Sequence, residues 1–253
     1  MNLLPPQHKR RGVEGDVGEM LHARRRFLDA GYYLPLLDAL TTRVRGIIES
    51  SAGTSVVAEV GCGEGYYIGN IAASVGPAAA FLGTDLSKPA VKLAARRYPD
   101  VLFFVSDVHR RLYVPDATLD VLLDVFAPRN AAEFARVLRP DAAALVVLPS
   151  EKHLASARAE LGLLEIEAQK ERRVLESLAE DFTVVDRQQI EYALELPASA
   201  VADLVGMGPN YWHGERTRAF EGESLRTNAS FVVLHLERNL DRARQPTGTT
   251  EPD

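Results

Sequence analysis

The sequence predicts an α/β protein built on a doubly wound, seven-stranded sheet that is mostly parallel and contains one antiparallel strand. From residue 55 onward, short apolar runs alternate with helical segments, which is the order expected of strands joined by right-handed crossovers. The early runs are apolar on both faces, as buried parallel strands are. The last run, at 231–237, alternates apolar and polar residues and is expected to be the antiparallel strand.

The individual elements follow from hydrophobic periodicity and from glycine and proline breaks. Gly31 divides a helical pattern at 17–50 into two helices, and Pro99 and Pro140 end two later ones. Further helices are expected at 64–75, 88–97, 130–138, 154–179 and 197–206. Strands are expected at 55–60, 80–84, 101–106, 120–125, 144–148, 182–185, 189–196 and 231–237.

These elements divide the chain into three parts. Residues 1–50 are expected to form an N-terminal arm and a helical cover, and residues 51–240 the main domain. Residues 241–253 are rich in charge, proline and threonine, which predicts a disordered tail. The stretch at about 197–230, before the last strand, is too long for a bare loop and is predicted to be an insertion that acts as a lid.

The composition is that of a soluble globular protein, with 46% hydrophobic and 25% charged residues. A single cysteine excludes an internal disulfide framework and a zinc ribbon within the chain, and we expect no metal. The sequence shows neither a membrane-length apolar run nor a secretory signal, so we expect a cytoplasmic protein without a membrane partner. The net charge of -6 favours solvated faces over a nucleic-acid surface for two basic clusters, at 8–11 and 24–26.

A glycine-rich loop, Glu59-Val60-Gly61-Cys62-Gly63-Glu64-Gly65, follows the first predicted strand directly. Its glycines let the backbone turn sharply and approach a ligand, and the next helix points free N–H groups at that ligand. The second strand ends at Asp85, whose carboxylate can accept hydrogen bonds from both ribose hydroxyls. The third ends at Ser106-Asp107, within reach of an adenine amine. Three strand ends in this order predict a nucleotide-like cofactor.

Carboxylates in and before the loop decide between two such cofactors. Glu59 and Glu64 would repel a pyrophosphate but attract the ammonium group of a methionine. The pattern therefore favours S-adenosylmethionine over a nicotinamide dinucleotide, and it resembles the E/D-x-G-x-G-x-G motif of the Rossmann-like class I methyltransferases. Simpler roles exist: a helix charge for Glu64, a turn residue for Asp107 and a helix cap for Asp85, although Ser87 is the better cap.

The predicted cofactor site includes one residue of the N-terminal helices. Arg26 is expected to pair with the methionine carboxylate, while Arg24 and Arg25 are expected to be solvated. The expected cofactor-binding residues are Arg26, Glu59, Gly61, Gly63, Gly65, Tyr66, Asp85, Leu86, Asp107, Val108 and Asp124.

A closer resemblance covers nearly the whole chain, from residue 2 to about 237. It is carried by NLLPPQHK at 2–9, EMLHARRRFLDAGYY at 19–33, GCGEGYY at 61–67, DLSK at 85–88, DVFAPRN at 124–130, and MGP at 207–209 with Trp212-His213. Together these motifs resemble the bacterial 23S rRNA guanine-N1 methyltransferases. The resemblance implies a class I enzyme that converts S-adenosylmethionine to S-adenosylhomocysteine.

One departure from that family concerns the substrate. The family begins with a four-cysteine zinc ribbon implicated in gripping rRNA, and this sequence has no such ligand set. We therefore expect a small planar aromatic substrate, indole- or purine-like, such as a tryptophan-derived metabolite of secondary metabolism. Methylation of a guanine N1 in 23S rRNA is the alternative, and a ribbon encoded upstream of Met1 would reverse this order. A cofactor-binding regulator without catalysis is the weakest hypothesis, because the loop and strand ends are intact.

The acceptor is expected beside the end of the fourth strand. The resemblance implies that segment 124–130 touches cofactor and substrate together. Phe126 can stack on a planar ring, and Asp124 is either a base or a strand-end carboxylate bonded to backbone. Tyr33 and His213 complete the expected catalytic set, whereas His153 is expected to be a loop histidine.

Further substrate contacts are expected from the N-terminal helices and from the insertion. An aromatic cluster in a segment rich in glycine and proline predicts a lid that stacks on the substrate, with His213 as base. A homodimer contact is the alternative, because interfaces use the same residue types. The expected substrate-binding residues, besides Phe126, are His22, Tyr32, Met207, Asn210 and Trp212.

Overall fold

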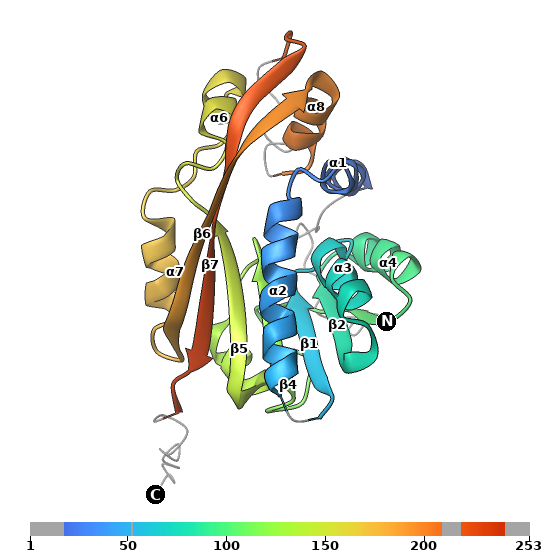
Figure 1. Cartoon of the computed structure of the whole chain (residues 1–253), viewed down its shortest axis with the longest axis vertical. Helices are drawn as coiled ribbons and strands as arrows, with labels where there is room; N and C mark the ends of the chain where they lie inside the picture. Colours follow the sequence, from blue (N-terminus) through green and yellow to red (C-terminus); the bar gives the residue numbers. More distant parts are fainter. Residues whose placement is uncertain (1–17, 52, 209–218, 241–253) are drawn as a thin grey trace, which may run out of the picture.

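The computed structural model describes residues 18–51, 53–208 and 219–240. Within this part of the chain, seven strands form one sheet in the order β3-β2-β1-β4-β5-β7-β6 (Figure 1). The strands are β1 (Ser55–Val60), β2 (Ala79–Asp85), β3 (Val101–Val105), β4 (Leu119–Val125), β5 (Leu138–Pro149), β6 (Phe182–Pro197) and β7 (Ser224–Arg238). Because β7 pairs antiparallel with both β5 and β6, it is the one antiparallel strand, and the predicted fold class is confirmed.

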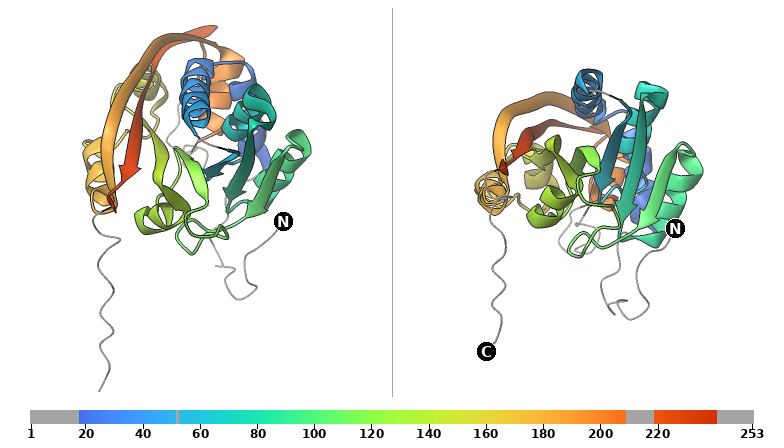
Figure 2. Two further views of the ribbon diagram at one scale, coloured as in Figure 1. Left: turned by 60° about the horizontal axis from the view of Figure 1, so that its bottom comes forward. Right: turned by 90° about the horizontal axis from the view of Figure 1, so that it is seen from below.

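Helices cover both faces of the sheet (Figure 2). They are α1 (Gly18–Asp29), α2 (Leu34–Ser50), α3 (Tyr66–Val75), α4 (Lys88–Arg97), α5 (Ala131–Val137), α6 (Ala155–Leu161), α7 (Lys170–Leu178) and α8 (Ala198–Gly206), with a 3-10 turn at Gly76–Ala78. Successive strand residues alternate between two cores: Val57 packs with α2 and α3 on one face, and Ala58 packs with α5 and α7 on the other. Apolar side chains on both faces explain why the early strands read as continuous apolar runs.

Three predicted elements differ from the structure in the C-terminal third. The helix expected at 154–179 is two helices, α6 and α7, because Gly162 ends α6 in a left-handed conformation with φ of +67°. The strands expected at 182–185 and 189–196 are one strand, β6, with a register shift between Val184 and Asp186. Strand β7 begins at Ser224, so the connection between the last two strands is shorter than the predicted insertion at 197–230.

The β6–β7 hairpin extends beyond the end of β5. Strand β5 pairs with 231–237 of β7 and stops at Pro149, while residues 224–230 continue alongside 191–197 of β6. Helix α8 follows this overhang and lies next to α1 (Figure 1). The two helices are joined by an ion pair between Arg26 and Asp203, with N···O of 2.5 Å. One end of the sheet is therefore enclosed by segments from both halves of the chain.

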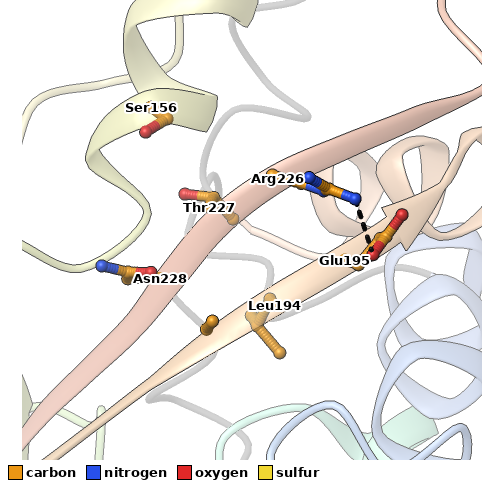
Figure 3. Close-up of a pocket in the computed structure, with 7 residues that line it drawn as sticks. Ser156, Leu194, Glu195, Arg226, Thr227 and Asn228 are labelled. Atoms are coloured by element: carbon orange, nitrogen blue, oxygen red, sulfur yellow. Dashed lines mark ion pairs between the residues drawn. The ribbon is translucent and has the colours of Figure 1, made fainter.

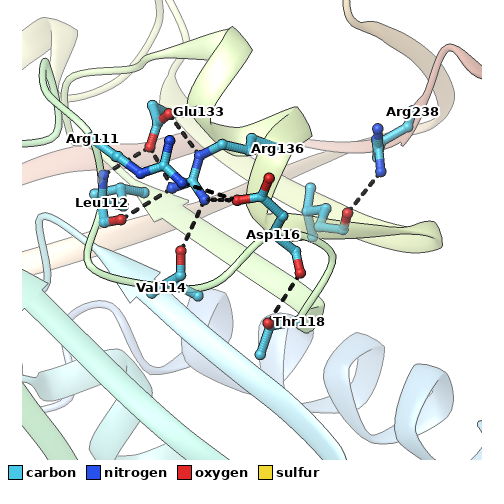
Figure 4. Close-up of polar contacts among 9 residues, drawn as sticks. Arg111, Leu112, Val114, Asp116, Thr118, Glu133, Arg136 and Arg238 are labelled. Carbon is cyan, nitrogen blue, oxygen red and sulfur yellow. Dashed lines mark hydrogen bonds and ion pairs between the residues drawn. The ribbon is translucent and has the colours of Figure 1, made fainter. Parts of the chain in front are cut away.

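The connection from β3 to β4 is fastened to α5 (Figure 4). The Arg136 guanidinium donates hydrogen bonds to the carbonyl oxygens of Leu112 and Val114, each at 3.0 Å. Its partner Glu133 accepts from the Leu112 amide at 2.7 Å, and the bond from Arg136 is the main reason the pKa of Glu133 is lowered. This anchor fixes the loop that begins at Asp107, directly after β3.

Some predictions fall outside the described residues. These are the arm at 1–16, the tail at 241–253 and the candidate residues Asn210, Trp212 and His213. Among the described helices, none combines the length and the apolar character that crossing a bilayer requires.

Candidate active site

A cavity of about 970 Å³ opens at the carboxyl ends of β1, β2, β4 and β5. This is where an open parallel sheet places its ligands. Part of the predicted site lines the cavity: Tyr33, Glu59, Gly61, Gly63, Tyr66, Asp85, Leu86, Asp107, Val108, Phe126 and Met207. The described candidates that do not line it are His22, Arg26, Tyr32, Gly65 and Asp124.

The glycine loop is packed tightly against the segment that follows β4. Gly61 has φ of +66°, and a Cβ atom on it would lie 2.4 Å from the Ala127 Cβ. Only glycine fits this position, because both the backbone conformation and the space exclude a side chain. Gly65, by contrast, packs against the Phe103 ring and does not reach the cavity, so its role is in packing.

The Asp85 carboxylate, at the end of β2, is held by two backbone amides. Oδ2 accepts from Gly63 N at 2.9 Å and Oδ1 accepts from Ser87 N at 2.7 Å. Helix α4 is capped by Ser87, whose hydroxyl accepts from Ala90 N at 3.3 Å, as the sequence indicated. Asp85 also lines the cavity, so its carboxylate borders a ligand bound there.

Several buried polar atoms around the loop have no partner among the described residues. They are Glu64 Oε1, Tyr67 Oη, Thr84 Oγ1 and Ser106 Oγ, and all four residues line the cavity. Buried polar groups are normally hydrogen-bonded, so this lining fits a polar ligand better than an apolar one. Burial is also the main reason that the pKa of Glu64 is raised, against the opposing effect of Arg24.

Glu59 anchors the start of α3. Its Oε2 accepts from Ile68 N at 2.9 Å, which replaces the side-chain cap that Gly65 cannot supply. Burial raises the pKa of Glu59 to about 8. A cationic group in the cavity would favour the ionised form of this carboxyl.

Asp124, for which catalytic and cofactor-binding roles are predicted, is buried and does not line the cavity. It is 0% exposed, its Oδ1 accepts from Ala127 N at 3.2 Å, and it is absent from the cavity lining. Arg129 Nε lies 3.2 Å from Oδ2, although not in hydrogen-bond geometry. Burial raises the pKa of Asp124 to about 7 despite this arginine. The alternative interpretation, a strand-end carboxylate bonded to backbone, matches the structure.

Phe126 presents an aromatic surface to the cavity. Its side chain is 41% exposed, and the residue adopts φ of +58°, which is unusual for a non-glycine residue. The ring centroid lies 5.5 Å from that of Phe231 on β7. The left-handed turn after β4 thus directs an aromatic ring outward into the site.

Arg24 occupies the place expected for Arg26. Residues two positions apart on an α-helix are separated by about 200° around its axis, so the side chains of Arg24 and Arg26 leave α1 on opposite sides. Arg24 lines the cavity, where a Cβ on Gly63 would lie 3.3 Å from its Nη1, and it donates to Met207 O at 2.9 Å. Arg26 is 63% exposed and is paired with Asp203.

Two further candidates from the N-terminal helices, His22 and Tyr32, lie outside the cavity lining. His22 is exposed on α1, two positions before Arg24 and therefore on another side of the helix. The Tyr32 ring packs on Phe27 at 4.7 Å, and its carbonyl accepts from Tyr192 Oη at 2.8 Å. Neither residue lines the cavity.

His153 is the functional candidate that sequence reasoning missed. It is 9% exposed, lines the cavity, and its Nε2 lies 3.1 Å from the Tyr33 hydroxyl. Burial lowers the pKa of His153 to about 3, helped by Arg158 and Lys170, so the ring is neutral. Its position shortly after β5 was the only sequence signal, and any loop histidine would give the same one.

A second, more open hollow of about 520 Å³ lies on the β6–β7 overhang beside α6 (Figure 3). Arg226 and Glu195 face each other there at 3.6 Å and are 83% and 60% exposed. No cluster of three metal-ligating side chains occurs in the described ranges. The cavity at the strand ends, by contrast, is lined by most of the described candidate residues.

The chain is similar to known methyltransferases. A family model described as a methyltransferase domain matches residues 57–141. A protein of Micromonospora griseorubida, provisionally named a 23S rRNA guanine-N1 methyltransferase, is 42% identical over 81% of this chain and 72% of its own length. The 23S rRNA (guanine(748)-N1)-methyltransferase of Streptomyces fradiae is 38% identical over 79% of this chain and 71% of its own length.

Solved structures show the same fold at low identity. A methyltransferase of Aquifex aeolicus, dependent on S-adenosylmethionine, has a TM-score of 0.52 at 15% identity, covering 87% of this chain and all of that one. The YcgJ protein of Bacillus subtilis has a TM-score of 0.52 at 16% identity, covering 78% of this chain and 99% of that one. Given the identity and coverage of the two actinobacterial relatives, the chain belongs to the bacterial 23S rRNA guanine-N1 methyltransferase family and is an S-adenosylmethionine-dependent methyltransferase.

Proposed function

We propose that this protein methylates N1 of a guanine in 23S rRNA. The observation that carries the proposal is the identity of 42% and 38% to relatives named for that activity, over about four-fifths of the chain. The same observation favours rRNA over the small aromatic metabolite that the sequence first suggested.

The cofactor half of the cavity suits S-adenosylmethionine, which supplies an activated methyl group on a sulfonium sulfur. Asp85 would accept from the ribose hydroxyls while its bonds to Gly63 and Ser87 hold it in place. Asp107 and Val108, on the anchored loop, would border the adenine. The methionine end would lie beside Gly61, and its carboxylate beside the positively charged Arg24.

The acceptor half suits a planar base. Phe126 offers a stacking face at the end of β4, next to the glycine loop. Methyl transfer needs the acceptor nitrogen in line with the sulfonium, so the main task of these side chains is to orient the base. A guanine must be turned out of any helix to reach such a cavity.

Positive side chains at the cavity suit an RNA backbone despite the net charge of -6. Lys170 lines the cavity. Its pKa is lowered mainly by burial and, to a smaller extent, by the nearby charge of Arg129. Local cations of this kind attract phosphates irrespective of the overall charge of the protein.

The direct test uses labelled S-adenosylmethionine with three acceptors: unmethylated 23S rRNA, free indole compounds and free purines. We expect label in the rRNA at a single guanine, mapped by arrest of reverse transcription, because an N1 methyl group blocks base pairing. Asp85→Ala serves as the control that ties the signal to the cofactor site. Labelling of a free heterocycle with none in rRNA would overturn the proposal.

A further inference from the structure

Tyr33 and His153 form a buried pair whose hydrogen-bond direction is fixed. His153 Nδ1 lies 3.2 Å from the backbone nitrogen of Ser230, which donates to it. A backbone amide can only donate, so Nδ1 carries no proton and accepts. The neutral ring must then carry its proton on Nε2.

That tautomer determines what the tyrosine can do. Nε2 lies 3.1 Å from Tyr33 Oη, and because Nε2 carries the hydrogen, Oη is the acceptor of this bond. No other described residue is within hydrogen-bond reach of the Tyr33 hydroxyl. Both residues line the main cavity, so the phenolic hydrogen is available to a ligand there. Burial raises the pKa of Tyr33, which keeps that hydrogen in place.

The pair stands beside the aromatic face offered to the acceptor. The Phe231 ring centroid lies 4.9 Å from that of Tyr33, 4.7 Å from His153 and 5.5 Å from Phe126. One buried ring thus joins the stacking residue and the donor pair. Arg158 donates to the His153 carbonyl oxygen and, at 2.7 Å, to that of Glu151, which holds the backbone of the histidine.

We propose that Tyr33 donates a hydrogen bond to the carbonyl oxygen adjacent to the methylated nitrogen, O6 in the case of guanine, and that His153 keeps Tyr33 in the donor state. This inference rests on the proposed function, because it takes a guanine as acceptor. Tyr33 touches the substrate, whereas His153 is a positioning residue.

The role follows from the chemistry of a lactam nitrogen. As N1 loses its proton to solvent, negative charge spreads onto O6, and a donor there stabilises the anion. The N1 lone pair then forms the N–CH3 bond while the C–S bond breaks and its electrons return to sulfur, leaving a neutral base and a thioether. S-adenosylmethionine is consumed as a substrate, so no further reactant is needed.

The same donor selects the base. Adenine places an amino group where guanine has O6, so the Tyr33 hydroxyl would face another donor. An indole has no carbonyl at all. A site built to pair with one oxygen discriminates against analogues that lack it.

Tyr33→Phe tests the donor, because it removes one hydroxyl and preserves the buried ring. We expect kcat on rRNA to fall about 100-fold with little change in KM, and S-adenosylhomocysteine affinity to stay the same. The pH at which kcat becomes maximal should rise, since N1 deprotonation loses its support. Tyr192→Phe is the matched control, because its hydroxyl bonds to Tyr32 O outside the cavity.

His153→Gln and His153→Leu test the positioning role. A glutamine amide can accept from Ser230 N and donate to Tyr33, so we expect His153→Gln to retain most of the activity. We expect His153→Leu to lose activity and to show the same rise in the pH of maximal kcat as Tyr33→Phe. Equal losses in both variants at unchanged melting temperature would refute the role of His153. Wild-type kcat in Tyr33→Phe would refute the donor, and absence of rRNA methylation by the wild type would instead refute the proposed function.

Discussion

The Asp85 carboxylate accepts a hydrogen bond from the Gly63 amide at 2.9 Å, and this bond joins the end of β2 to the glycine loop. It joins residues 22 positions apart in the sequence, and both of them line the cavity. The carboxylate therefore shapes the loop as well as offering acceptor positions to a ligand. A substitution at Asp85 is expected to act on both.

Asp85→Ala is expected to weaken S-adenosylhomocysteine binding between 10- and 100-fold, the size of about one lost hydrogen bond to a charged group. Isothermal titration calorimetry measures this directly. Asp100→Ala, an exposed aspartate beyond α4, is the control and should bind as the wild type does. Unchanged affinity in Asp85→Ala would remove Asp85 from the cofactor site.

Gly61→Ala is expected to abolish cofactor binding, because the new Cβ would lie 2.4 Å from the Ala127 Cβ. Gly76→Ala is the control, since Gly76 has φ of +71° and nothing within 4 Å of the added atom. Its ψ of -151° makes a side chain at least as strained there as at Gly61, so a greater loss of affinity in Gly61→Ala reports steric exclusion. If the two variants lose equal affinity, the tight packing of the loop is not what matters.

Arg24→Leu is expected to reduce cofactor affinity about 10-fold by removing a charge from the cavity lining. Arg26→Leu should leave affinity unchanged, because Arg26 points to Asp203 and is 63% exposed. Calorimetry on the two variants distinguishes neighbours only two positions apart. The reverse ranking would restore the assignment first made from the sequence.

Phe126→Ala is expected to raise KM for rRNA about 10-fold or more, the usual effect of losing one base–aromatic stack. Cofactor affinity and melting temperature should change little, since the ring is 41% exposed. Tyr113→Ala, an aromatic residue 49% exposed outside the cavity lining, is the control. Steady-state kinetics measures KM for rRNA in both variants. Equal KM values in Phe126→Ala and Tyr113→Ala would contradict the stacking role of Phe126.

The buried, neutral His153 predicts a pH effect on stability. Its pKa is about 3 in the folded protein, against about 6.5 when exposed, so below pH 6.5 only the unfolded chain takes up the proton. Stability is therefore lost as pH falls from 6.5 toward 3, by about 2 kcal/mol at pH 5 from this group. In urea unfolding at pH 7.5 and 5, His153→Gln should lose less stability than the wild type. Equal losses would show that His153 does not stay neutral.

The local parts of the fold could be predicted from the sequence because they depend on residues close together in the chain. The glycine spacing, the cap at Ser87 and the strand end at Asp85 are each specified within a few positions. The inward position of Arg24 could have been predicted too. On α1 it falls three or four positions from the buried residues Met20, Leu21, Phe27 and Leu28, and so on their side of the helix. The angular position of Arg24 around the helix indicates that it faces inward, whereas its place in the run of three arginines does not.

The residues at the substrate-binding end of the cavity could not be predicted in the same way. His153 acquires its tautomer from Ser230 and its partner from Tyr33, which are 77 and 120 residues away in the sequence. Asp124 looks like a catalytic carboxylate by position, yet a turn of three residues directs it onto the Ala127 amide. Such roles depend on tertiary contacts that no local pattern records.

Strand β7 has a consequence for the order in which the site assembles. It comes after β6 in the chain but lies between β5 and β6, so during synthesis β6 has no sheet partner until β7 emerges. Ser230 and Phe231, on β7, then complete the surroundings of His153. A nascent chain can build the glycine loop early, but the base-binding end is completed only when this late strand docks. An unpaired β6 is meanwhile an exposed edge, where misassembly would begin.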